Sequence, residues 1–66
     1  MNLANIIRER RVELNISQSD LAQMADVGIA TVKEIERGQG NPRLTTLLKI
    51  MEVLGMDIDF HIRKTV

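Results

Sequence analysis

The sequence predicts an all-α fold of four to five helices, followed by a short β-strand that pairs across a homodimer. Apolar residues recur at helical spacing through most of the 66-residue chain. Residues 17–38 hold the start and stop signals of two short helices joined by a tight turn. From residue 56 onward the pattern changes to alternation of apolar and polar residues, which is typical of a half-buried strand.

Length and composition allow one domain, residues 1–66, with a small core. A chain of this size buries only about 60% of its unfolded surface and commonly needs a covalent staple or a partner. It has no cysteine and one histidine, which excludes disulfides and an ordinary structural zinc site. We therefore expect no metal and no cofactor, and extra support from oligomerisation. No apolar run is long enough to span a bilayer, and no signal peptide is recognisable. We expect a cytoplasmic protein with no membrane partner.

The first helix is expected from about Leu3 to Leu14, with Asn2 as its N-cap. Leu3, Ile7 and Leu14 form one apolar stripe at helical spacing. Asn15 then ends the helix, because asparagine tolerates the left-handed region better than most residues.

Two short helices follow between Ser17 and Gly38. Ser17 and Asp20, three residues apart, have the form of a capping box. Residues 26–28 break the second helix and start the third, with Gly28 as its N-cap, and Gly38 can adopt the positive φ that ends the third. The positions expected to face inward are Leu21, Ala22, Met24 or Ala25, Val27, Val32 and Ile35.

The fourth helix is expected from about Leu44 to Leu54, with Gly55 ending it. It carries more apolar residues than one small core requires. We expect the surplus, Ile50 or Leu54, to form a partner surface. The residues expected to complete the core of the monomer are Leu47, Leu48 and Met51.

Residues 17–38 resemble the helix-turn-helix of the lambdoid phage repressor and Cro family, also called the Xre family. Within the motif the resemblance is carried by Gln18, Leu21, Ala22, Val27, Thr31, Val32, Ile35, Glu36 and Gly38. On the flanks it includes Ile7, Arg11, Asn41, Pro42, Leu44, Leu47, Leu48, Ile50, Leu54 and Gly55. It covers roughly residues 3 to 55, which implies a lambda-repressor-like helical core whose third helix enters the DNA major groove.

The same resemblance implies which residues contact DNA. Relatives often have Gln, Arg or Ser at the tip of the recognition helix, but here Ile29 and Ala30 stand there. These side chains cannot hydrogen-bond a purine but can contact a thymine methyl group, and the alternative for Ile29 is contact with a partner or incidental exposure. Lys33 can donate to guanine and Glu34 can accept from cytosine, whereas the plain alternative is a solvated helix face followed by a simple connecting loop. The expected DNA-binding residues are Ser17, Gln18, Gly28, Ile29, Ala30, Thr31, Lys33, Glu34, Arg37, Asn41 and Arg43.

Total charge does not identify DNA as the partner, because nine basic and nine acidic residues cancel. A DNA-binding domain is expected to carry a basic surface, so the distribution of charge decides the matter. Lys33, Arg37 and Arg43 lie near the expected DNA face, and Asp57 and Asp59 lie in the last third. We expect modest non-specific affinity and a moderate salt dependence.

The resemblance also implies an interior ion pair between Arg11 and Glu36, which closes the recognition helix. A planar guanidinium suits a two-pronged contact with a carboxylate. The alternative is that Arg11 lies on a solvated helix surface. If Arg11 pairs with Glu36, Arg10 is free for solvent or a phosphate. Gln18 either contacts a phosphate or supports the recognition helix.

Residues 56–64 are predicted to form a dimerisation strand. A fifth helix is the alternative, but it would place Ile58 and Ile62 on one face and leave Phe60 pointing elsewhere. A lone strand has an exposed edge, and its natural mate is the same strand of a second copy across a two-fold axis. The ending resembles that of HipB-type antitoxins, which have such a two-stranded lid. The expected dimer interface is formed by Met56, Ile58, Phe60 and Ile62.

We therefore expect a sequence-specific repressor that binds a palindromic operator in double-stranded DNA as a homodimer. The alternative is an antitoxin that binds a toxin protein and regulates its own operon, and a restriction–modification controller is also compatible with the fold. No nucleophile–base pair, metal-ligand cluster or phosphate-binding glycine motif is present. We expect no enzymatic activity, no catalytic residues and no small-molecule ligand.

Overall fold

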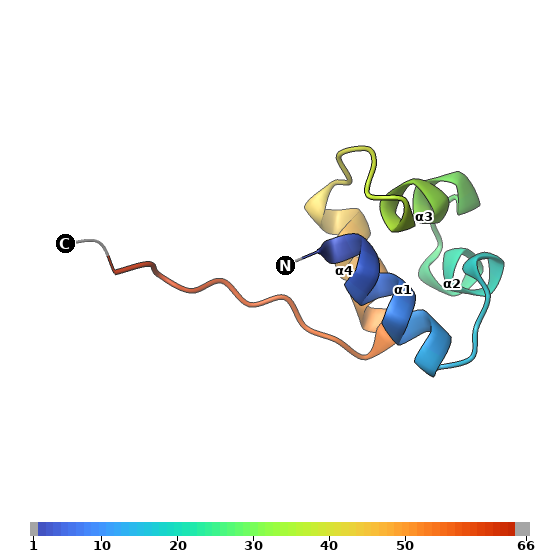
Figure 1. Cartoon of the computed structure of the whole chain (residues 1–66), viewed down its shortest axis with the longest axis horizontal. Coiled ribbons are helices and arrows are strands. Elements are labelled where there is room, and N and C mark those ends of the chain that lie inside the picture. The colour runs from blue at the N-terminus through green and yellow to red at the C-terminus, as the bar shows by residue number, and fades with distance from the viewer. Residues whose placement is uncertain (1, 65–66) are drawn as a thin grey trace.

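The computed structural model describes residues 2–64, and within that range the chain forms four α-helices and no β-strand. The helices are α1 (Leu3–Glu13), α2 (Gln18–Ala25), α3 (Ile29–Glu36) and α4 (Leu44–Leu54) (Figure 1). Helix α2 packs on α3 and α4, and α1 packs on the same two helices. The all-α prediction is confirmed.

Local signals begin and end the helices where the sequence places them. The side chain of Asn2 accepts a hydrogen bond from the backbone N–H of Asn5 and so caps α1. Asn15 follows α1 with a φ of +58°, in the left-handed region. In the capping box of α2, the Asp20 N–H donates to Ser17 Oγ over 2.9 Å, and the Ser17 N–H donates to Asp20 Oδ2 over 3.0 Å. These short-range contacts mark the start of α1 and the break between α1 and α2.

One core lies between the four helices and differs from the prediction at α4. Ile50 and Leu54, one or other of which is expected to be surplus, are both fully buried, whereas Leu48, expected in the core, is 46% exposed. The inward stripe of α4 runs through positions 47, 50, 51 and 54 at the i, i+3, i+4, i+7 spacing, and Leu48 lies one position off that stripe. The fully or nearly fully buried apolar residues are Ala4, Ile7, Leu21, Ala22, Ala25, Val32, Ile35, Ile50, Met51 and Leu54.

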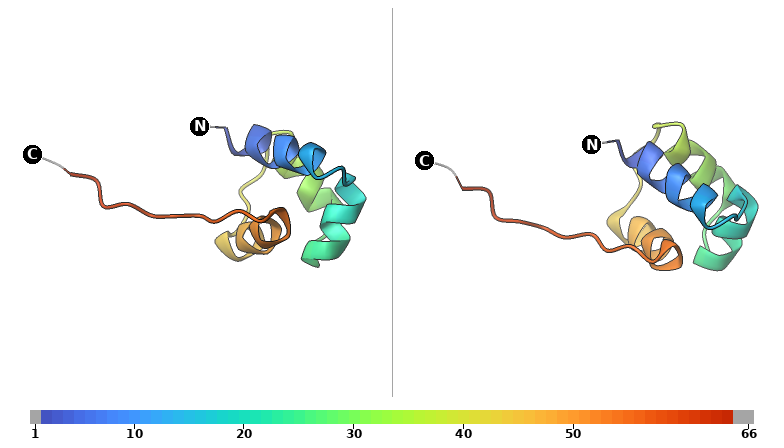
Figure 2. Two further views of the ribbon diagram at one scale, coloured as in Figure 1. Left: turned by 90° about the horizontal axis from the view of Figure 1, so that it is seen from below. Right: turned by 60° about the horizontal axis from the view of Figure 1, so that its bottom comes forward.

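The segment after α4, which we call the tail (residues 56–64), is extended and runs away from the helices (Figures 1 and 2). Its first residue is fixed, because the Met56 N–H donates to the Met51 carbonyl over 2.9 Å. Met56 and Ile58 pack against the core, whereas Phe60 and Ile62 are exposed. The single chain forms neither the predicted strand nor the alternative fifth helix in residues 56–64, because a strand needs a mate that supplies its hydrogen bonds.

None of the helices in residues 2–64 is both long enough and apolar enough to cross a membrane.

Candidate nucleic-acid interface

The end of α3 is held by a buried ion pair. Arg11 of α1 donates from Nε to Glu36 Oε2 over 2.8 Å and from Nη2 to Glu36 Oε1 over 2.9 Å. Its third nitrogen, Nη1, donates to the Ile16 carbonyl over 2.9 Å. Glu36 is only 6% exposed. The hydrogen bond to Glu36 raises the pKa of the Arg11 guanidinium, and burial opposes that rise. The two residues therefore form the two-pronged contact that the family resemblance implied.

Gln18 adds a third helix to this contact. Its Nε2 donates to Glu36 Oε1 over 3.3 Å, so the carboxylate accepts from α1 and α2 together. Among residues 2–64, each fully buried side-chain nitrogen or oxygen has a hydrogen-bond partner. Of the two roles expected for Gln18, the structure shows support of the recognition helix through this hydrogen bond. The network of Arg11, Gln18 and Glu36 fixes the orientation of α3 on the other helices.

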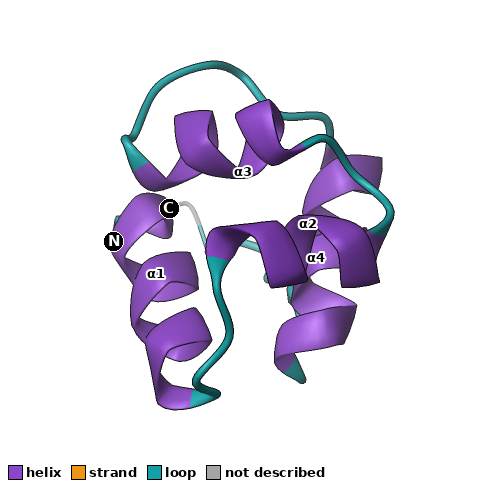
Figure 3. Cartoon of the chain, turned by 90° about the vertical axis from the view of Figure 1, so that its right-hand side faces the viewer, coloured by secondary structure: helices purple, strands orange, loops and turns teal. Residues whose placement is uncertain are grey.

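The opposite face of α3 is open to solvent. Val32, Ile35 and Glu36 turn inward, and helical spacing turns the remaining positions outward. Ile29, the first residue of α3, is 41% exposed, and α3 lies at one edge of the helical body (Figures 1 and 3). The outward residues that belong to the predicted site are Gly28, Ile29, Ala30, Thr31, Lys33, Glu34 and Arg37.

Three exposed cations lie on α3 or in the residues between α3 and α4. Lys33 lies on α3, Arg37 follows its last residue, and Arg43 directly precedes α4. The ion pairs found in residues 2–64 are Arg10–Glu13 and Arg11–Glu36, so none of these three cations is in one. Their charge is available to an anionic partner.

The α3–α4 loop folds back toward α3. Gly38 and Gly40 have φ values of +74° and +79°, and the Gln39 N–H donates to the Glu34 carbonyl over 3.0 Å. A Cβ atom at Gly40 would lie 3.4 Å from Glu34 Oε2, so the carboxylate lies against the loop backbone. Asn41, the remaining predicted loop residue, is exposed. The carboxylate of Glu34, the one acid expected on the DNA-facing side of α3, thus lies beside the α3–α4 loop.

Two further polar groups, in Ser17 and Arg10, make contacts within the chain. The backbone N–H of Ser17, one of the expected DNA-binding residues, donates to the Asp20 carboxylate within the capping box. Arg10, expected to be free, donates from Nε to the Leu54 carbonyl over 2.9 Å and lies 3.4 Å from Glu13. It therefore ties α1 to the last turn of α4. No local pattern predicts the Arg10 contact, because its two residues lie 44 positions apart in the chain.

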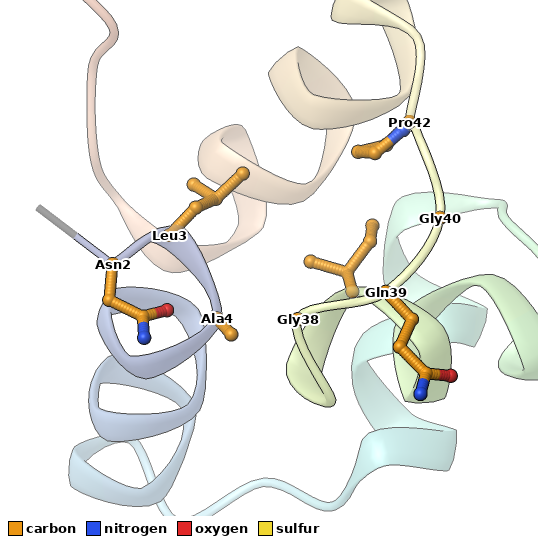
Figure 4. Close-up of a pocket in the computed structure, with 8 residues that line it drawn as sticks. Asn2, Leu3, Ala4, Gly38, Gln39, Gly40 and Pro42 are labelled. Atoms are coloured by element: carbon orange, nitrogen blue, oxygen red, sulfur yellow. The ribbon is translucent and has the colours of Figure 1, made fainter.

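A shallow pocket of about 300 Å³ separates the start of α1 from the α3–α4 loop (Figure 4). Asn2 borders it on the α1 side, and Gln39 belongs to the loop on the other side, as Figure 4 shows. None of its described lining residues is titratable, so it offers no general acid or base. Residues 2–64 also contain no group of three or more His, Asp or Glu side chains that could hold a metal ion.

A helix-turn-helix family model matches residues 7–61 of the chain. An uncharacterised HTH-type transcriptional regulator of Haemophilus influenzae is 44% identical over 45 residues, which are 68% of this chain and 46% of that protein. An HTH-type transcriptional regulator of Deinococcus deserti is 31% identical over 58 residues, 88% of this chain and 45% of that protein. The chain thus spans about half the length of these two relatives.

Similarity to a solved structure extends over most of both chains. The restriction-modification controller protein C.AhdI from Aeromonas hydrophila is 30% identical, with a TM-score of 0.81 over 85% of each chain. An HTH-type regulator of Sinorhizobium fredii, 29% identical, is matched over 88% of this chain and 76% of its own length.

Proposed function

Because the chain belongs to the Xre/Cro-like helix-turn-helix family, we propose that it is a transcriptional regulator that inserts α3 into the DNA major groove. The observation that carries the proposal is the contrast between the two faces of α3. Its inner face is locked by the buried contact of Glu36 with Arg11 and Gln18. Its outer face is open to solvent, and the cations Lys33, Arg37 and Arg43, on α3 or between α3 and α4, are in neither of the ion pairs found in residues 2–64. A rigid helix with a free face is what base reading requires.

The chemistry of that face defines the expected readout. Ile29 and Ala30 offer only apolar contact, so we propose that they meet thymine methyl groups. Lys33 donates to the O6 or N7 atom of guanine. Arg37 and Arg43 neutralise phosphates, which positions the protein without specifying sequence.

We further propose that the regulator is a homodimer that represses transcription from a palindromic operator. The apolar Phe60 and Ile62 of the tail, exposed in the single chain, support a second copy as partner. A two-fold dimer would place its recognition helices in half-sites about 34–36 Å apart. Repression follows where the operator overlaps a promoter.

A role as a restriction–modification controller is the second candidate. The observation that favours it is the fold shared with C.AhdI over 85% of both chains. The neighbouring genes distinguish the two roles, because a controller's operator should lie beside restriction and modification genes. The antitoxin alternative remains a prediction, and copurification with a toxin protein would be its test.

The experiment that tests the proposal is selection of bound duplexes from a random DNA pool, followed by measurement of affinity for the selected site. We expect a palindrome with thymines opposite Ile29. Lys33→Ala combined with Arg43→Ala should weaken binding by about 10- to 100-fold, through loss of a base contact and a phosphate contact.

The matched control removes two cations elsewhere. Arg8→Ala combined with Lys49→Ala changes the net charge equally at exposed positions of α1 and α4, and we expect at most a few-fold loss of affinity. Equal losses in the two double variants would mean that only net charge matters. Unchanged affinity of the Lys33/Arg43 variant would reject the proposed DNA face.

A further inference from the structure

The tail has an apolar face that its own chain covers only in part. Residues of one parity share a face in an extended segment, so the alternation of residues 56–62 sorts apolar from polar side chains. Met56 and Ile58 are half-buried against the core, but Phe60 is 79% exposed and Ile62 is 99% exposed. The apolar face therefore continues beyond the point where the helical body can cover it.

The tail also lines an apolar groove of about 410 Å³. Leu3 of α1 and Leu44 and Leu47 of α4 form its wall, and Ile58 and Phe60 border it from the tail. Phe60 stays largely exposed at this edge. A further apolar side chain placed beside Ile58 would cover the groove and the exposed ring together.

The polar face of the tail is divided by charge. Asp57 and Asp59 come first and Arg63 comes last, with His61 between them, whereas Lys64 has the parity of the apolar face. A segment that is acidic at one end and basic at the other is complementary to a second copy of itself in antiparallel orientation. That complementarity identifies another copy of this chain as the occupant.

We propose that two tails pair as an antiparallel ribbon whose two-fold axis passes between the two copies of Phe60. This inference rests on the homodimer proposed above and adds its register. A two-fold axis normal to the ribbon places each residue opposite one of the same parity, so only registers centred on a residue are allowed. In this register Asp57 lies opposite Arg63, Asp59 opposite His61, and Ile58 opposite Ile62.

The neighbouring registers form fewer complementary pairs. An axis at residue 58 places Asp57 opposite Asp59, and an axis at residue 59 places Asp59 opposite itself. Like charges directly opposite each other are destabilising. An axis at residue 61 would pair Asp59 with Arg63 and Phe60 with Ile62, but it places Ile58 opposite Lys64 and no cation opposite Asp57. Only the register centred on Phe60 pairs Ile58 with Ile62, opposes Asp57 with a cation, and sets Ile62 of the second copy beside the groove.

Disulfide trapping tests this register directly, because the natural chain contains no cysteine. Full-length chains carrying Ile58→Cys and Ile62→Cys are mixed, oxidised and separated without reductant. Directly opposed residues lie within the Cα distance that a disulfide spans, whereas two copies of residue 58 would be about 13 Å apart. We expect at least tenfold more cross-linked product in the mixture than in either variant alone.

Other pairs of cysteine variants and the oligomeric state distinguish a wrong register from the absence of the ribbon or of the dimer. A mixture of Ile58→Cys with His61→Cys, which lies on the other face, should cross-link no better than a single variant. Preferred cross-linking of Ile58→Cys with Phe60→Cys would indicate an axis at residue 59 and overturn the register while leaving the dimer intact. A dimer in sedimentation without any tail cross-link would overturn the ribbon, and a monomer at all concentrations would reject the dimer itself.

A charge-swap cycle gives an independent measurement on chains without cysteine. Asp57→Lys or Arg63→Glu alone places like charges opposite each other twice per dimer, and we expect each to raise the dimer dissociation constant about tenfold. The double variant restores opposite charges and should return to within about threefold of the natural chain. Lys64→Glu, which faces Met56 in this register, is the control and should change little. Additive losses in the double variant would overturn the Asp57–Arg63 pairing.

Discussion

The helical body, residues 2–55, and the tail, residues 56–64, differ in where their side chains find partners. In the body, the buried carboxylate of Glu36 accepts hydrogen bonds from Arg11 and Gln18. In the tail, Phe60 and Ile62 are exposed to solvent although both are strongly apolar. The body thus pairs its buried polar groups within one chain, whereas the tail leaves the most exposed of the large apolar side chains, Phe60 and Ile62, uncovered. The two regions should respond to substitution in opposite ways.

The largest expected effect in the body is the loss of one partner from the buried ion pair. Arg11→Ala leaves the Glu36 carboxylate buried with only Gln18 as a side-chain donor, so we expect the free energy of unfolding to fall by about 3–5 kcal/mol in urea titrations. Arg11→Met combined with Glu36→Leu removes both charges and should recover most of the loss. Arg8→Ala, at an exposed position of the same helix, is the control, and an equal loss there would contradict the role of the pair.

Two leucines of α4 compare buried with exposed positions on one helix. Leu54 is fully buried and Leu48 is half-exposed. Leu54→Ala creates a cavity and should cost about 2–5 kcal/mol of unfolding free energy, whereas Leu48→Ala should cost about 1 kcal/mol or less. Thermal unfolding at concentrations where the chain is monomeric measures both. The reverse order would mean that α4 is rotated relative to the described core.

The cap of α2 should contribute less. Ser17→Ala removes the acceptor for the Asp20 N–H and should cost about 1 kcal/mol. Hydrogen bonds from the backbone and side chain of Ser17 lower the pKa of Asp20 below its ordinary value of 3.8. A lowered folded-state pKa gives stability that is present above the ordinary pKa and is lost as the pH falls through the folded-state value. The natural chain should therefore lose stability in that acidic window, and Asp20→Asn should reduce this loss.

The smallest effect on folding is expected in the tail. Phe60→Asp touches a side chain that the helical body does not cover, so the unfolding free energy of the monomer should change by no more than about 0.5 kcal/mol. Sedimentation should nevertheless show the loss of the dimer, because a carboxylate would be buried at its centre. Asp59→Asn, on the polar face, should leave the dimer in place. A dimer that persists in Phe60→Asp would show that the tail is not its interface.

The features predicted correctly from the sequence are those that depend on neighbouring residues. The capping box of Ser17 and Asp20, the left-handed Asn15 and the ends of α4 all arise within a few positions of the chain. The ion pair of Arg11 with Glu36 spans 25 positions, and only resemblance to a family implied it.

The features predicted wrongly depend on distant packing. A count of apolar residues in α4 indicates a surplus but does not fix the rotation of the helix about its axis. The prediction therefore places Leu48 in the core and Ile50 or Leu54 on the surface, whereas Ile50 and Leu54 are buried and Leu48 is exposed. The contact of Arg10 with α4 depends on how two remote helices meet. The strand depends on a second molecule, which one chain does not contain. The DNA-contact residues remain predictions for the same reason.

The bond from Arg10 to the Leu54 carbonyl acts at the point where the tail leaves the helical body. Gly55 follows with a φ of +67°, and a Cβ atom there would lie 3.6 Å from Arg10 Nη2. In a dimer joined through its tails, a small rotation at this joint would be magnified along the length of each helical body. Through this hydrogen bond Arg10 would limit that rotation. We expect it to help set the operator spacing that the dimer accepts.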